Sequence, residues 1–122
     1  MAQGSTLTAA DYVHLHNHTQ YSLLDGLTRI DQLMDYVVAQ GMPAVAMTDH
    51  GTLSGAIEFY KEAINHEVKP IIGIETYVAA RGHKDRDPAK DKNRFHLILL
   101  AMDSRGYQNL MQLSTIANLD GF

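Results

Sequence analysis

The sequence contains no cysteine and no tryptophan, and only 3 of its 122 residues are proline. The absence of cysteine excludes disulfide bonds and thiolate metal sites, so any metal ion must be bound by nitrogen and oxygen atoms. No apolar run approaches the roughly 18 residues of a membrane-spanning helix, and the first residues have neither the basic nor the apolar segment of a secretory signal. We therefore expect a cytoplasmic protein without a membrane partner.

The sequence also lacks an excess of positive charge. Its formal net charge is −4, which disfavours a domain that holds nucleic acid through its overall field. The charge is uneven, because residues 81–94 hold six of the ten Lys and Arg residues but three of the fourteen acidic residues. This charged loop indicates either a basic flap on an anionic, cation-binding body or an ordinary solvated loop.

The apolar pattern predicts alternating strands and helices. Strands are expected at residues 12–18, 44–47, 70–78 and 95–102, and helices at residues 30–38, 54–66 and 104–118. Thr28 and Asp31 resemble a capping box for the first helix, and Gly41 is expected to end it. The predicted buried stripe of the second helix is Ala56, Ile57, Tyr60, Ala63 and Ile64. This order predicts an α/β fold with parallel strands and right-handed crossover helices, in an open sheet or a barrel.

Three histidines occupy alternate positions of the first predicted strand. His14, His16 and His18 therefore share one face, where apolar or plainly solvated residues are usual. Imidazoles two residues apart lie about 7 Å from each other at their Cα atoms, which is near enough to share a metal ion. The alternative is a polar strand face on which each histidine is hydrogen-bonded to a neighbour.

Further polar residues follow the first two strands. Asp25 could complete or bridge a metal site, although Asp-Gly is also a common turn pair. Asp49 and His50 come directly after a buried strand, at the end where α/β folds place their chemistry. The alternative for Asp49 is a capping role for the next helix.

Two polar residues interrupt the later strands. Glu75 lies in a strand that is otherwise suited to full burial, so its carboxylate must be paired, metal-bound or protonated, unless the strand ends there in solvent. His96 lies near the beginning of its strand, which is the wrong end for a site at the carboxyl edge of a parallel sheet. Together the candidate ligands are His16, His18, Asp25, His50, Glu75 and His96. Six nitrogen and oxygen ligands suit two or more divalent ions that activate water for attack at phosphorus.

Five ordered motifs carry a family resemblance: HLHNHT, YSLLDG, MTDHG, GIETYV and FHLILLA. In this order they resemble the PHP (polymerase and histidinol phosphatase) domain, in the form found at the amino terminus of bacterial DNA polymerase III alpha subunits. The likeness runs from about Tyr12 to Phe122. It implies a distorted (β/α)7 TIM-like barrel that binds two or three divalent ions (Zn, Mn or Mg) with the six candidate ligands.

The resemblance also implies roles and partners. The expected catalytic residues are Asp25, His50 and Glu75. Two further residues, His14 and Asp49, are expected to contact the ligands without binding the metal themselves. The implied activity is phosphoester hydrolysis, with 3′→5′ exonuclease proofreading in the polymerase members that retain the ligands. Contacts with the DNA backbone are expected from Arg81, Lys84, Arg86, Lys90 and Lys92. The expected partners are the remainder of a polymerase chain, a DNA 3′ end, and a proofreading subunit or a second copy of the chain.

The sequence departs from the family pattern in one respect. The later ligands of the family, from a Ser-Gly-Cys segment and an Asp-x-His pair, are not in these 122 residues. We therefore expect residues 12–122 to form the first half of the domain and its barrel. Residues 1–11, which precede the resemblance, are expected to be a flexible extension. Two alternatives remain open: a structural or partner-docking scaffold with vestigial metal sites, and a stand-alone phosphoesterase of the histidinol phosphatase kind.

Overall fold

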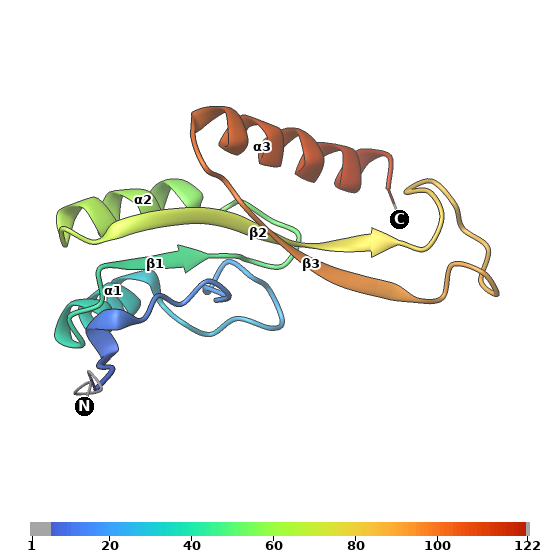
Figure 1. The fold of residues 1–122 in the computed structure, drawn as a ribbon. Helices are drawn as coiled ribbons and strands as arrows, with labels where there is room; N and C mark the ends of the chain where they lie inside the picture. The colour runs from blue at the N-terminus through green and yellow to red at the C-terminus, as the bar shows by residue number, and fades with distance from the viewer. Residues whose placement is uncertain (1–5, 122) are drawn as a thin grey trace.

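The structure is a computed structural model that describes residues 6–121, in which three strands form one mixed sheet in the order β1-β2-β3. The elements are the 3-10 helix η1 (Ala9–Asp11), α1 (Ile30–Ala39), β1 (Ala44–Met47), α2 (Ala56–Asn65), β2 (Lys69–Ala79), β3 (Arg94–Leu100) and α3 (Ser104–Leu119). Figure 1 shows α1, β1 and α2 gathered at one end of the molecule, with α3 running above β2 and β3. The loop between β2 and β3 extends at the other end (Figure 1).

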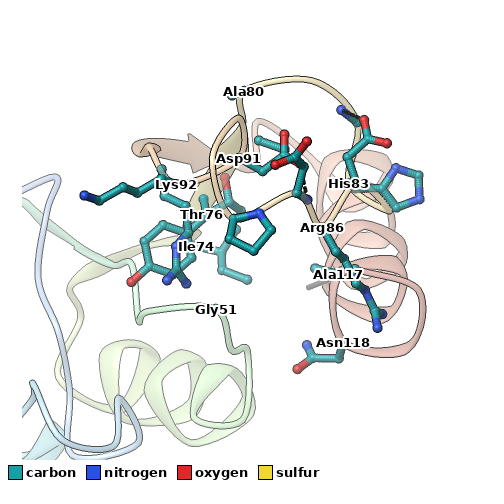
Figure 2. A pocket seen from close by; sticks show the side chains of 18 residues that line it. Gly51, Ile74, Thr76, Ala80, His83, Arg86, Asp91, Lys92, Ala117 and Asn118 are labelled. Carbon is teal, nitrogen blue, oxygen red and sulfur yellow. Dashed lines mark hydrogen bonds between the residues drawn. The ribbon is translucent and has the colours of Figure 1, made fainter.

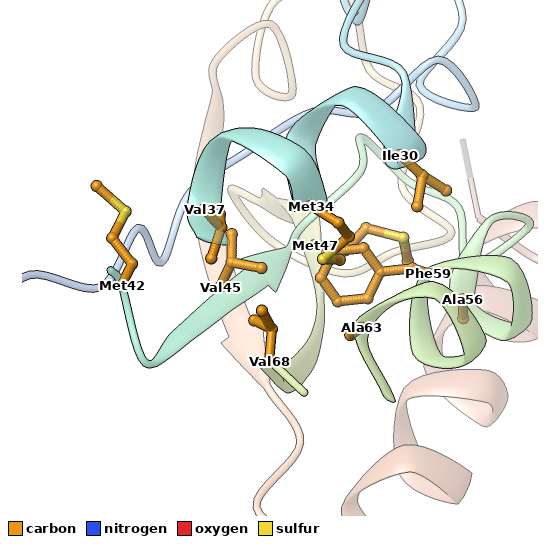
Figure 3. Packing of buried hydrophobic residues seen from close by; sticks show 10 residues of the cluster. All are labelled: Ile30, Met34, Val37, Met42, Val45, Met47, Ala56, Phe59, Ala63 and Val68. Carbon is orange, nitrogen blue, oxygen red and sulfur yellow. The ribbon is translucent and has the colours of Figure 1, made fainter. Parts of the chain in front are cut away.

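The hydrophobic core lies between α1, β1 and α2. Phe59 is fully buried near the centre of this cluster and packs among residues of all three elements (Figure 3). The cluster consists of Ile30, Met34, Val37, Met42, Val45, Met47, Ala56, Phe59, Ala63 and Val68. All four residues of β1 are buried, as the apolar run predicted. The core therefore fixes β1 and, with it, the polar residues that follow Met47.

The first predicted strand, residues 12–18, is wrong. The segment forms only an isolated parallel bridge between His14 and Val45, with further backbone bonds from Ala46 N to His14 O and from Thr48 N to Asn17 O, each 2.9 Å long. The side chain of Asn17 is the physical reason, because its amide donates to the carbonyl oxygens of His14 and Ala46. A side chain that bonds nearby backbone groups replaces part of a regular ladder.

The expectation of an all-parallel sheet is also wrong. β1 and β2 pair in parallel, but β2 and β3 pair antiparallel, with Glu75 opposite Ile98 and Tyr77 opposite His96. A parallel neighbour needs a crossover connection, usually a helix, whereas antiparallel strands can be joined by a loop. The charged segment between β2 and β3 contains no helix. This reversal brings the beginning of β3 beside the second half of β2.

The ends of the first helix were predicted in part. Gly41 has a φ of +69° directly after α1, which is the left-handed conformation expected where a helix ends. The Thr28–Asp31 capping box does not form, because Arg29 is the N-cap residue and binds Asp31 through its guanidinium group. The first helical N–H, from Ile30, donates instead to the side chain of Gln20. A distant side chain has therefore replaced the local cap.

The predicted buried stripe of α2 needs a correction. Ala56 and Ala63 are buried, but Ile57, Tyr60 and Ile64 are exposed. Phe59 takes the central buried place instead. When apolar residues extend around much of a helix, the sequence does not determine which face is buried. In α2 the buried face is the one with Phe59, whose large ring fills the space beside α1 and β1.

Two further expectations concern the chain as a whole. Within residues 6–11 of the predicted flexible extension, Ala9–Asp11 form a short 3-10 helix, and residues 1–5 lie outside the described part. Three strands do not close a barrel, so the barrel stays a prediction. None of the described helices is long and apolar enough to cross a membrane.

Candidate metal centre

The carboxylate of Glu75 lies at the centre of three histidine side chains. Its Oε2 is 2.9 Å from Nε2 of His16 and also contacts Nε2 of His18, while its Oε1 is 2.7 Å from Nδ1 of His96. The Glu75 side chain is only 3% exposed. Burial raises the pKa of Glu75, but its hydrogen bonds with His16 and His18 outweigh this effect and hold the pKa below its usual value. The carboxylate is therefore buried and in contact with histidines, which is one of the alternatives that the sequence left open, and it does not lie at a solvent-exposed strand end.

A second carboxylate, that of Asp25, faces the other side of His18. Its Oδ2 is 2.8 Å from Nδ1 of His50 and 3.3 Å from Nδ1 of His18. The hydroxyl of Ser22 donates to Oδ1, and this bond, followed by that with His50, lowers the pKa of Asp25. Asp25 is thus more than a turn residue, because His18 connects it to Glu75 in one continuous cluster.

Buried backbone and side-chain bonds hold the histidine segment against β1. The buried carboxylate of Asp49 accepts two bonds of 2.6 Å, one from the Thr19 N–H and one from the Thr19 hydroxyl. Burial raises the pKa of Asp49, and the bonds from Thr19 oppose that shift. The peptide groups of Asp49 also join β2, because its carbonyl accepts from the N–H of Glu75. Asp49 therefore links His18, through Thr19, to the strand that carries Glu75.

His50 is placed by bonds to both its backbone and its ring. Its N–H donates to the Ser22 hydroxyl, and its Nδ1 lies beside Asp25. Its Nε2 is buried and is without a hydrogen-bond partner among the described residues. A buried polar atom usually has a partner, so this nitrogen is available for a ligand that the protein itself does not supply.

The antiparallel pairing explains His96, which the sequence placed at the wrong end of its strand. Because β3 runs against β2, the beginning of β3 lies beside the carboxyl half of β2. The ring centroid of His96 is 5.2 Å from that of His50 and 4.8 Å from that of Tyr77. The reversed strand therefore brings His96 into the same cluster as the ligands from earlier segments.

The two residues expected to support the ligands differ in their placement. Asp49 bonds Thr19 and the backbone N–H of Glu75, and its support of metal ligands stays a prediction. The ring of His14 lies edge-on to Tyr12, with centroids 4.8 Å apart, and its carbonyl bonds Ala46. His14 thus anchors the segment to β1 through its backbone, and a role of its imidazole toward metal stays a prediction.

The charged loop, residues 81–94, lines a cavity of about 540 Å³ together with residues of β2 and α3. Figure 2 shows this cavity between the loop, Gly51 and the C-terminal part of α3, with Lys92 and Arg86 in its lining. Three of the expected DNA-contacting cations already bind carboxylates: Arg81 binds Asp91, Lys90 binds Asp87 and Lys84 binds Asp120. Contacts of this loop with DNA stay a prediction.

The assembled side chains fit divalent metal ions. Nε2 of His16, Nε2 of His18 and the Glu75 carboxylate offer ligand atoms that all lie within 4.8 Å of one another. Imidazole nitrogen and carboxylate oxygen together suit Zn, Mn and similar ions. The Nε2 of His50, which has no hydrogen-bond partner among residues 6–121, adds a further ligand atom. Such a cluster could activate water and neutralise the charge of a phosphoester.

Two residues that contact the candidate ligands, Ser22 and Tyr77, were not predicted from the sequence. Ser22 bonds both His50 and Asp25, and Tyr77 lies against the rings of His50 and His96. The alternation of β2 could have revealed Tyr77, because a residue two positions after Glu75 lies on the same strand face. The role of Ser22 has no comparable signal, since it depends on a turn whose path the sequence does not determine.

The chain is similar in sequence to a known domain family and to subunits of DNA polymerase III. The PHP domain family matches residues 14–122. The chain is 53% identical over 115 residues to the DNA polymerase III subunit alpha of Thermus aquaticus and 46% identical over 130 residues to that of Deinococcus radiodurans. These matches cover 91% and 100% of this chain but 9% and 10% of the relatives. The chain thus spans about a tenth of the length of these curated relatives.

Two solved structures share the fold at low sequence identity. One is a protein from Bifidobacterium adolescentis that is provisionally described as a metal-dependent phosphoesterase, with a TM-score of 0.56 and 17% identity. The other is an amidohydrolase from Chromobacterium violaceum with bound sulfate and no metal, with a TM-score of 0.56 and 20% identity. Each match covers 82% of this chain and 32% of the other.

Proposed function

Because this chain belongs to the PHP domain family, we propose that its histidine–carboxylate cluster is a multi-metal site that hydrolyses phosphoesters. The observation that supports this proposal is the convergence of four candidate histidines around the two candidate carboxylates, those of Glu75 and Asp25. These groups lie at residues 16–18, 25, 50, 75 and 96, so five stretches of the chain contribute to one cluster. The buried Nε2 of His50, which has no partner among the described residues, gives the same indication.

The ligands divide between the two carboxylates. His16 and His96 contact Glu75, His50 contacts Asp25, and His18 reaches both through its two nitrogens. We infer that one divalent ion is held around Glu75 and another around Asp25. Divalent ions held by these residues would supply water activation and neutralisation of negative charge on the phosphoester.

The residues proposed to be catalytic are Asp25, His50 and Glu75. The carboxylates of Asp25 and Glu75 are ionised at neutral pH, since their hydrogen bonds lower both pKa values. The ionised carboxylate of Asp25 accepts a hydrogen bond from His50 Nδ1–H, which leaves the lone pair on Nε2 directed away from Asp25. His50 would thus direct Nε2 toward a bound ion, while Glu75 contacts three imidazoles.

The proposed substrate is the 3′ end of a DNA strand, with 3′→5′ exonuclease proofreading as the activity of the protein that carries this chain. This proposal rests on the relatives, which are DNA polymerase III alpha subunits. The charged loop at residues 81–94 would contact the DNA backbone, most directly through Lys92 beside the cavity. The proposed partners are the rest of a polymerase chain and a proofreading subunit, or a second copy of this chain.

The test is hydrolysis by the protein that carries this chain. Single-stranded DNA labelled at its 3′ end should lose nucleotides when Mn²⁺ or Zn²⁺ is present, and a chelator should stop the reaction. His18→Ala should abolish it, because this side chain contacts both carboxylates. His66→Gln is the matched control, since His66 binds Asp35 and lies outside the cluster. Hydrolysis of a small phosphate ester with no action on DNA would instead favour a stand-alone phosphatase.

A structural role is the second candidate, and one observation favours it. Each candidate histidine already contacts a carboxylate, so the cluster could join its segments without a metal ion. The doubly substituted variant His16→Ala/His18→Ala separates the two functions. Lost hydrolysis with an unchanged melting temperature indicates catalysis. Lost stability in a protein that never hydrolysed DNA indicates a scaffold.

A further inference from the structure

Tyr77 is in contact with two of the proposed ligands, which come from different parts of the chain. Its ring centroid lies 4.8 Å from that of His50, in the loop after β1, and 4.8 Å from that of His96, on β3. The rings of His50 and His96 are themselves 5.2 Å apart. The three rings therefore form a mutually contacting group at the edge of the cluster.

The backbone places Tyr77 there by regular strand geometry. Tyr77 follows Glu75 by two residues, so both side chains lie on the same face of β2. It is also the direct cross-strand partner of His96. The guanidinium group of Arg94 lies over the Tyr77 ring, 5.3 Å from its centroid, which gives the ring a further neighbour.

His50 and His96 need such a contact because hydrogen bonds alone leave their rings incompletely held. Each ring has one nitrogen beside a carboxylate: Nδ1 of His50 beside Asp25, and Nδ1 of His96 beside Glu75. The side chain of His96 is 51% exposed, so little else packs against it. A single hydrogen bond fixes one atom of an imidazole but permits the ring to tilt.

We propose that Tyr77 is a positioning residue that fixes the imidazole planes of His50 and His96 and thereby maintains the metal affinity of the site. The proposal rests on the metal site proposed above. Edge and tilted ring contacts at this separation are favourable and directional. Binding groups that are held in place before the ion arrives lose less conformational freedom when it binds. The aromatic ring of Tyr77 carries this role, because the contacts involve the ring.

The exposure of Tyr77 makes the proposal separable from a general structural role. The residue is 49% exposed, so its removal should cost the metal-free fold little. Tyr60 on α2 is a matched control, because it is 52% exposed and lies on another element. A purely structural effect of losing a half-exposed tyrosine would appear in both variants.

The experiment compares Tyr77→Ala, Tyr77→Leu and Tyr77→Phe with Tyr60→Ala in the protein that carries this chain. Affinity for Zn²⁺ and Mn²⁺ is measured by titration calorimetry, and the Co²⁺ absorption spectrum reports histidine coordination. The melting temperature is measured without metal. Loss of the ring should weaken metal binding by about 10–100-fold, the range found when groups supporting a ligand are removed. Tyr77→Phe should bind like the unmodified protein, and Tyr60→Ala should too.

Each other outcome refutes a defined part of the proposal. Unchanged affinity in Tyr77→Leu and Tyr77→Ala would refute the positioning role while leaving the metal site intact. Equally weak binding by Tyr77→Phe would refute the ring contact as its basis. If Tyr77→Ala does not fold, Tyr77→Leu decides, because leucine keeps apolar bulk on the strand. An unmodified protein that binds no metal would refute the proposed function itself, and the role of Tyr77 with it.

Discussion

Replacement of Glu75 by glutamine should remove metal-dependent stabilisation and leave the metal-free fold intact. The amide has nearly the size of the carboxylate, so packing in β2 is preserved. The amide lacks the negative charge with which the carboxylate attracts a divalent ion. The carboxylate of Glu75 contacts three other candidate ligands, His16, His18 and His96. In the metal-free protein the loss of stability should be modest, because the amide can still hydrogen-bond with the imidazoles; the lowered pKa of Glu75 shows that the carboxylate contacts outweigh the cost of burying its charge.

The expected magnitude follows from binding linkage. A metal ion at 100 times its dissociation constant stabilises the folded state by about 2.7 kcal/mol. If Glu75→Gln raises that constant about 100-fold, the same ion concentration gives only about 0.4 kcal/mol. For a chain of this size, about 2.7 kcal/mol corresponds to a rise in melting temperature of roughly 10 °C. The variant should therefore lose most of that rise.

The assay is thermal unfolding with and without Zn²⁺ or Mn²⁺, followed by circular dichroism at one protein concentration. Glu67→Gln is the matched control, because Glu67 is exposed and lies outside the cluster. A metal-induced rise in Glu75→Gln as large as that of the unmodified protein would refute the central place of this carboxylate. A large drop in metal-free stability would instead show that the histidine contacts of Glu75 hold the fold together.

Three further substitutions test the core, the link behind the site and a histidine away from it. Phe59→Ala should lower the free energy of unfolding, measured with urea, by about 3–5 kcal/mol, whereas Ile57→Ala on the exposed side of α2 should lower it by under about 1 kcal/mol. Similar losses in the two variants would contradict the observed rotation of the helix. Asp49→Ala should lower the free energy of unfolding by about 1–3 kcal/mol, because the N–H of Thr19 is left without an acceptor, and should weaken metal binding measured by calorimetry. An unchanged free energy of unfolding would refute the stabilising role of the Asp49–Thr19 bonds. The backbone bond to Glu62, followed by the contact with Asp35, raises the pKa of His66, so its stabilisation is present below the ordinary histidine pKa and is lost as the pH rises through the raised value. His66→Gln should therefore lower the melting temperature more at pH 5.5 than at pH 8.5, and an equal effect at both would refute it.

The sequence by itself determined the composition of the site and much of the local structure. The buried run at residues 44–47, the Gly41 helix end and the six candidate ligands could all be read from residue type and spacing. These features are local, or they depend on side-chain chemistry that few residues possess. A carboxylate inside an apolar strand must find a partner whatever the fold, which is why Glu75 could be recognised.

Only the tertiary structure decided how these groups meet. The direction of β3 depends on the long loop before it, and apolar alternation is the same for a parallel and an antiparallel strand. The rotation of α2 depends on which side chain fills the space beside α1, and Phe59 does so. His96 therefore looked misplaced in the sequence and lies beside Glu75 in the fold, because the strand that carries it runs in the opposite direction.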